Sequence, residues 1–178
     1  MRPGWTARAA LATWGAALGL VLLGTSCSAV DSNAISPLAV PDRDQYINQG
    51  VSTFMEKRCG ALDCHGQVGR PLRIYSSTGL RKNLVKGERD TRATQPDELL
   101  DNYYATVGLE PEEISQSRVT QGAFTDFLLL KKPLGIEGGG VRHKGGPVLR
   151  ATDPGFDCLI TWISGAVNKA KCEDGIIQ

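Results

Sequence analysis

The stretch Arg58-Cys59-Gly60-Ala61-Leu62-Asp63-Cys64-His65-Gly66 decides how the rest of the chain is interpreted. It holds two cysteines with four residues between them, and a histidine directly follows the second cysteine. Three chemistries use these groups: covalent haem attachment, a small disulfide loop beside an ordinary surface histidine, and a zinc site. Zinc is the weakest of the three, because the other histidine and cysteines that it would need lie far away in sequence.

The stretch resembles the haem-attachment site of c-type cytochromes, in the less common form with a four-residue spacer. The resemblance implies that Cys59 and Cys64 form thioether bonds to one haem c and that His65 is the proximal ligand of its iron. It also implies an all-α fold, a small cytochrome-c-like helical domain with long Gly-rich loops. The long spacer must bulge, and Gly60 is the residue type that permits a bulge most easily.

The second histidine of the chain, His143, lies in the Gly-rich loop 138–147. Lys132-Pro133-Leu134-Gly135, then His143 with Gly145-Gly146, then Trp162-Ile163 resemble a family of exported bacterial cytochrome-c-like domains, over residues 44–168. This resemblance implies that His143 is the distal iron ligand. Arg142 and Lys144 flank the histidine, and charged neighbours favour an exposed position for it. His143 is therefore either the distal ligand or an exposed surface residue.

Two arginines follow the cysteine stretch closely. Arg70 and Arg73 are the nearest cations to it, and a guanidinium group binds a carboxylate through paired hydrogen bonds. Both are therefore candidate partners of the haem propionates. The alternative is a solvated loop with scattered charges.

The N-terminal segment 1–27 is predicted to be an export signal, because two arginines precede an apolar run that is short for a membrane span. It ends in small residues before Cys27, which resembles the lipobox of bacterial lipoproteins and implies that Cys27 is lipidated. Gly24 departs from that pattern, so ordinary signal-peptidase cleavage remains the alternative. We expect the periplasmic face of a bacterial membrane, a lipid anchor, a flexible tether over 28–43 and a haem domain over 44–178.

Five cysteines in an exported protein leave one thiol over after pairing. If Cys27 is lipidated and the two cysteines of the motif bind haem, the remaining two, Cys158 and Cys172, can form a disulfide. A helix over 153–167 followed by an extended tail can bring these two together only if the tail runs back along the helix. The chain has 20 basic and 19 acidic residues and no basic stripe, so no nucleic-acid partner is expected.

Hydrophobic periodicity predicts four elements. Helices are expected over 44–57, 96–107 and 153–167, and a short helix or buried strand over 122–131, ended by Lys131-Lys132-Pro133-Leu134-Gly135. Residues 66–93 are expected to be irregular. Met55 is expected in the core, whereas Trp162 either contacts the porphyrin or belongs to the core.

Together these features predict an electron-transfer protein that exchanges electrons with a redox partner protein. It is expected to act as an electron carrier more than as a catalyst. Ligation by both His65 and His143 would close the iron to other ligands. If His143 stays away, a sensor or peroxidase is the alternative. A haem-free lipoprotein stapled by the disulfides Cys59–Cys64 and Cys158–Cys172, acting as a binding or structural module, is the third possibility.

Overall fold

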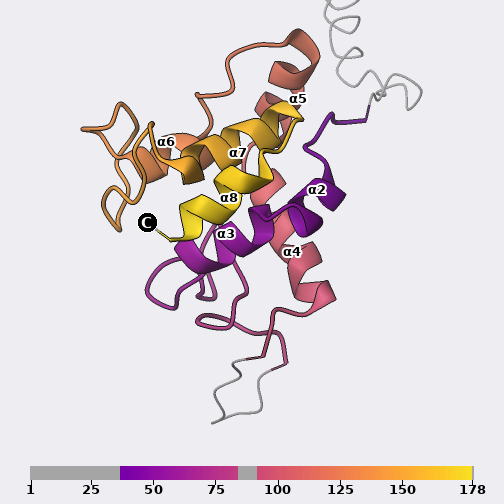
Figure 1. Cartoon of the computed structure of the whole chain (residues 1–178), viewed down its shortest axis with the longest axis vertical. Helices are drawn as coiled ribbons and strands as arrows, with labels where there is room; N and C mark the ends of the chain where they lie inside the picture. The colour runs from indigo at the N-terminus through magenta and orange to yellow at the C-terminus, as the bar shows by residue number, and fades with distance from the viewer. Residues whose placement is uncertain (1–36, 84–91, 178) are drawn as a thin grey trace, which may run out of the picture. The chain divides into compact units, whose positions relative to one another are not determined.

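The fold is described from a computed structural model, over residues 37–83 and 92–177. The described residues form seven helices and no strand, apart from an isolated bridge between Tyr75 and Leu80. The helices are α2 (Arg43–Asn48), α3 (Val51–Arg58), α4 (Pro96–Val107), α5 (Pro111–Thr120), α6 (Leu128–Leu134), α7 (Pro154–Ser164) and α8 (Lys169–Ile176), numbered as in Figure 1. The all-α prediction is confirmed for this part of the chain. The predicted signal 1–27, Cys27 and tether residues 28–36 lie outside it.

The helix predicted over 44–57 is two helices, because Gly50 interrupts it in the left-handed conformation at a φ of 88°. A Cβ on Gly50 would lie 3.0 Å from the Cβ of Cys172, so the break also makes room for α8. α3 packs on α4, α7 and α8, and α7 lies along α8 (Figure 1). Met55 is fully buried in α3, as expected.

The last residues of the predicted tether are fixed to the folded unit. The side chains of Tyr103 and Trp162 donate hydrogen bonds to the carbonyl oxygens of Pro41 and Asp42, at 2.8 and 2.9 Å. Trp162 lies in a buried aromatic cluster, with its ring centroid 5.1 Å from that of Tyr46. Of the two roles expected for Trp162, porphyrin contact or core, the structure shows the core role.

The structure confirms one further predicted helix, changes the bounds of another element and adds a helix that was not predicted. The helix predicted over 96–107 is confirmed as α4, with Pro96 at its start and Gly108 at its end. The element predicted over 122–131 is α6, which begins at Leu128, continues through Pro133 and ends at Leu134. The break expected over 131–135 is confirmed at Gly135, the C-cap, which has a φ of 65°. The added helix, α5, was not predicted, although Pro111 and two glutamates begin it.

The disulfide between Cys158 and Cys172 is present, with the two Cα atoms 4.7 Å apart. The route between them differs from the expected one. α7 ends at Ser164, where Gly165 adopts a φ of 107°, and the tail returns as the helix α8 instead of an extended strand. The sequence predicted the pairing correctly and missed the second helix.

Replacing Cys158 and Cys172 with alanine is expected to lower the free energy of unfolding by about 3 kcal/mol, because the bond closes a loop of about this length in the unfolded chain. Urea denaturation of the variant and of the wild type, oxidised and reduced, measures the difference. Equal midpoints for the oxidised and reduced wild type would contradict a stabilising disulfide.

Candidate functional site

The first cysteine of the motif is placed by the end of α3. Cys59 is the residue at which that helix ends, and its N–H donates to the carbonyl of Met55 at 2.9 Å. The next N–H, of Gly60, donates to Glu56 at 3.2 Å. A helix that runs directly into the cysteine stretch was expected, and it fixes the direction in which the loop leaves the core.

Backbone hydrogen bonds close the loop from Cys59 to Gly66 on itself. The N–H of His65 donates to the carbonyl of Cys59 at 2.9 Å, so the residues at the two ends of the motif are joined. The N–H groups of Cys64 and Gly66 both donate to Ala61, at 3.0 and 2.9 Å. The four-residue spacer is thus a defined turn that brings Cys59 and His65 close together.

Glycines allow a second segment to support this loop. A Cβ on Gly66 or on Gly79 would collide with the carbonyl oxygen of Gly60. A Cβ on Gly60 itself would lie 2.7 Å from the carbonyl of Glu56, and its φ is not in the left-handed region. Gly60 is therefore required for close approach, not for the positive φ that a bulge would need.

The ring of His65 is held by the backbone of the following segment. Its Nδ1 lies 2.8 Å from the carbonyl oxygen of Leu72. A carbonyl only accepts, so Nδ1 carries the proton and Nε2 keeps its lone pair. Burial lowers the pKa of His65, although the Leu72 hydrogen bond opposes this, and the nearby His143, Arg70 and Lys132 lower it further. His65 is thus held neutral, the form that binds metals.

His143 is arranged in the same way on the Gly-rich loop. Its Nδ1 lies 2.8 Å from the carbonyl oxygen of Gly146, so its Nε2 also keeps a lone pair. The N–H groups of Val141 and Val148 tie the loop to α6, by hydrogen bonds of 3.1 and 2.8 Å to Lys131 and Pro133. Residues 141–148 thus form a tip, anchored at both ends, that carries His143.

The two histidines, 78 positions apart in sequence, lie close together and line one cavity. Their ring centroids are 5.9 Å apart and their planes differ by 12°. The cavity has a volume of about 210 Å³, and its lining includes Cys64, Arg70 and Lys144 besides both histidines. A second cavity of about 210 Å³ adjoins His143 on the side of Gly135 and Pro147. The structure thus brings Cys64, His65 and His143 to one cavity, whereas Cys59 is not part of its lining.

The two candidate arginines differ in position. Arg70 lines the cavity, and its Nε is buried without a hydrogen-bond partner among the described residues, while Nη2 donates to Gln67 at 3.1 Å. Arg73 stacks on the ring of Tyr75 at 4.8 Å, and its Nη2 lies 3.7 Å from Asp101 of α4. The Nε of Arg73 is likewise buried without a hydrogen-bond partner among the described residues. The two arginines differ in place: Arg70 lines the cavity beside the histidines, whereas Arg73 lies at α4 and does not line it.

The thiols of Cys59 and Cys64 are free in the structure, so the disulfide loop between them is not formed. Burial raises the pKa of the Cys59 thiol to about 12, and the neighbouring Cys64 adds to this. Burial and Asp63 also raise the pKa of Cys64. Both thiols are protonated at neutral pH, which disfavours a thiolate nucleophile or a redox-active pair in the folded chain.

In protein produced without haem, iodoacetamide at about pH 8 is expected to alkylate Cys59 roughly fiftyfold more slowly in the folded chain than in denaturant. The raised pKa lowers the thiolate fraction about a thousandfold, and the greater nucleophilicity of a more basic thiolate recovers part of this. Mass spectrometry of each peptide gives the rates, with Cys64 as the internal comparison. Equal rates in the two states would show an exposed Cys59 sulfur.

Some residues that build the site were not singled out from the sequence. Leu72 and Gly146 act through their carbonyl oxygens, which no side-chain pattern reveals. Gly66 and Gly79 carried a signal, since glycine marks close backbone approach, but glycines are common throughout this chain.

No protein-family model, curated protein or solved structure matches this chain. Within the described ranges, no group of three or more His, Cys, Asp or Glu side chains is placed to hold a metal ion. The same part of the chain contains no helix long and apolar enough to cross a membrane. The site is therefore characterised by the histidine pair and the two free thiols beside it.

Proposed function

We propose that this chain is an electron-transfer protein that carries one covalently bound haem c in a cytochrome-c-like helical domain, attached through Cys59 and Cys64 and ligated by His65 and His143. The closeness of the two histidine rings, whose planes are nearly parallel, is the observation that carries the proposal. A metal bound at about 2.0–2.1 Å to one nitrogen of each imidazole places the two ring centroids about 6 Å apart. The observed centroid distance is 5.9 Å.

The donor set fits this cofactor. Both imidazoles have Nδ1 bound to a backbone carbonyl and a free lone pair on Nε2, the arrangement that carbonyl partners impose on metal-ligating histidines. Two unpaired thiols precede His65, and a guanidinium with a buried, unpartnered donor lines the same cavity. The cavity of about 210 Å³ is smaller than most ligand pockets, so a porphyrin would extend beyond it.

The chain's own residues would then set the properties of the site. Haem c, when bound, supplies a one-electron redox centre. The carbonyls of Leu72 and Gly146 fix the orientation of the two imidazoles and raise their basicity. Arg70 offers its guanidinium to a carboxylate beside His65.

If both histidines held the haem iron, no position would be open to another ligand, which would favour electron carriage over catalysis or gas sensing. The positions of the two histidines support this choice, since the sensor or peroxidase alternative needs His143 to stay away. The haem-free alternative needs a Cys59–Cys64 bond, and these thiols are free in the structure. Export, lipidation of Cys27, anchoring at the periplasmic face and a redox partner protein belong to the proposal on the sequence evidence given above.

A redox cycle of the purified protein tests the proposed function. The protein is exported from cells that also express cytochrome c maturation machinery. We expect a c-type absorption band on reduction with dithionite, loss of the band on oxidation with ferricyanide, and recovery over repeated cycles. The variant Cys158→Ala with Cys172→Ala serves as control and keeps the band. A colourless wild type would contradict the proposal.

A further inference from the structure

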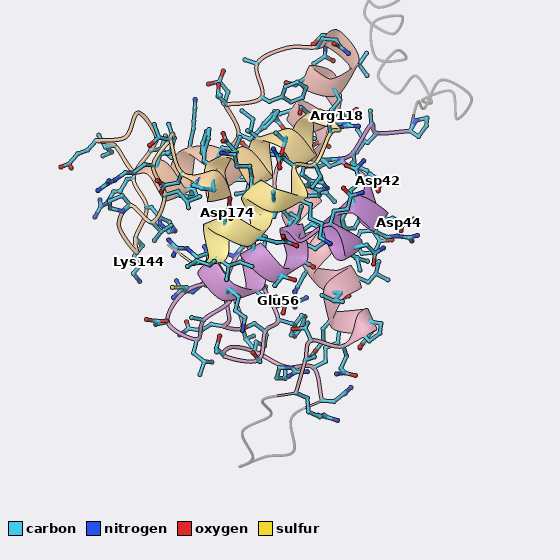
Figure 2. The ribbon with its side chains drawn as sticks, viewed as in Figure 1. Asp42, Asp44, Glu56, Arg118, Lys144 and Asp174 are labelled. Carbon is cyan, nitrogen blue, oxygen red and sulfur yellow. A yellow bond between two sulfur atoms is a disulfide. The ribbon has the colours of Figure 1, made fainter. Side chains whose placement is uncertain are left out.

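The surface around the histidine pair carries an excess of positive charge. Arg70, Arg142 and Lys144 line the two cavities that adjoin His143, against Asp63 and Glu137. The side chain of Lys144 is on the loop after α6 and projects away from the helices (Figure 2). The cations at this face outnumber its acids.

Two more cations belong to the same face. Arg58 donates a hydrogen bond of 3.1 Å to the carbonyl of Val148, which lines the cavity. The charge of Lys132 acts on His65 and lowers its pKa. The face thus has five cations and two anions, a net charge of +3, in a chain whose total charge is only +1.

Apolar side chains lie among these charges and are unusually exposed. Leu62, Val68 and Ile136 are 59%, 79% and 70% exposed. Leu62 adjoins Asp63 in the motif loop, Val68 lies two residues before Arg70, and Ile136 lines the second cavity. Apolar groups within a polar rim are typical of protein interaction surfaces.

The compensating acidic residues gather elsewhere. Glu110, Glu112, Glu113 and Asp126 line a cavity beside α5. Figure 1 shows α5 at one end of the folded unit, well away from the loop that follows α3. The folded unit therefore has a charge asymmetry, and the positive pole is the face that holds both histidines.

We infer that this face docks an acidic protein surface, through its cations other than Arg70, which the proposed function assigns to a haem carboxylate, and through the apolar side chains of Leu62, Val68 and Ile136. This inference rests on the proposed function, because the acidic partner is the protein that would exchange electrons with the haem at this site. Complementary charge increases the encounter rate and orients the partner so that its own redox centre faces His65 and His143. The apolar side chains contribute the short-range contact.

The inference can be tested whether or not the protein contains haem. A short labelled peptide of glutamates with two leucines is titrated into the isotope-labelled protein, at about 10 mM and about 150 mM salt. We expect NMR shift changes confined to residues 58–70 and 132–148, and weaker binding at the higher salt. The matched peptide with lysine in place of glutamate is expected to leave these residues unshifted.

Charge reversal at two places provides the control. The variant Arg142→Glu with Lys144→Glu is expected to raise the dissociation constant roughly tenfold at low salt. The variant Lys169→Glu with Lys171→Glu changes the total charge by the same amount on α8 and is expected to bind as the wild type does. Equal losses in both variants, or shift changes at α5, would overturn the inference. The absorption spectrum of the same sample reports separately on the proposed haem.

Discussion

Replacing His143 with alanine in the haem-loaded protein is expected to tighten the binding of carbon monoxide to the reduced site by about a hundredfold. In the proposed wild-type site, His143 must leave before another ligand can bind. If His143 has left the iron in about 1% of the molecules, the apparent affinity for carbon monoxide is about 1% of the intrinsic affinity. The alanine variant removes this competition.

Arg142→Ala is the matched control for this variant. It changes the neighbouring residue of the same tip and leaves the His143 Nδ1 hydrogen bond to Gly146 in place. We expect it to bind carbon monoxide as weakly as the wild type, measured by optical titration of the dithionite-reduced protein. If the wild type binds as tightly as the His143 variant, His143 is not an iron ligand and the sensor or peroxidase alternative gains support.

The second large effect is expected at a buried ion pair that supports the motif loop. Arg81 and Glu98 are both 2% exposed, and Arg81 Nη2 lies 2.9 Å from Glu98 Oε2. Arg81 also donates to the carbonyls of Arg92 and Ala93, at 2.6 and 3.1 Å. It lies two residues after Gly79, which packs against Gly60, so it connects the segment behind the motif to α4.

Arg81→Met is therefore expected to lower the free energy of unfolding by about 3–5 kcal/mol, because it leaves the carboxylate of Glu98 buried without its charge partner. The double variant with Glu98→Gln is expected to lose less than the sum of the two single changes. Chemical denaturation of the four proteins in this cycle measures the coupling. Additive effects would show that the two side chains do not stabilise each other.

The pH dependence of this contribution follows from the carboxyl group. Burial by itself raises the pKa of Glu98, but the hydrogen bonds from Arg81 and from the N–H groups of Gln95 and Lys82 hold the pKa below its usual value. The ionised form is thus favoured in the folded state. Its stabilisation is complete above the unfolded pKa of about 4.3 and is lost as the pH falls through the lower folded pKa. Glu98→Gln is expected to lack this part of the acid dependence.

The sequence predicted the elements whose local signals agree with the tertiary structure. α4 has a proline at its start, acidic residues in its first turn and a glycine at its end, and its predicted bounds are the observed ones. The Cys158–Cys172 pairing followed from the cysteine count and the reach of the chain. Local patterns are sufficient in these cases because few alternatives satisfy them.

The missed features depend on contacts between distant segments. The break at Gly50 is fixed by the approach of Cys172, and α8 forms where its buried Cys172 is bound to α7. The approach of His143 to His65 was suggested only by resemblance, because it depends on how residues 141–148 are tied to α6. Periodicity within one segment carries no information about such packing.

Intact-mass spectrometry of the exported protein tests the central claim most directly. The protein is produced with cytochrome c maturation machinery, denatured and fully reduced before measurement. We expect the wild type to be heavier by one haem, retained under reduction, than Cys59→Ala with Cys64→Ala, which has the mass of the processed polypeptide with any lipid on Cys27. A wild type without this added haem mass, from cells in which a control cytochrome is matured, would contradict covalent haem attachment at Cys59 and Cys64.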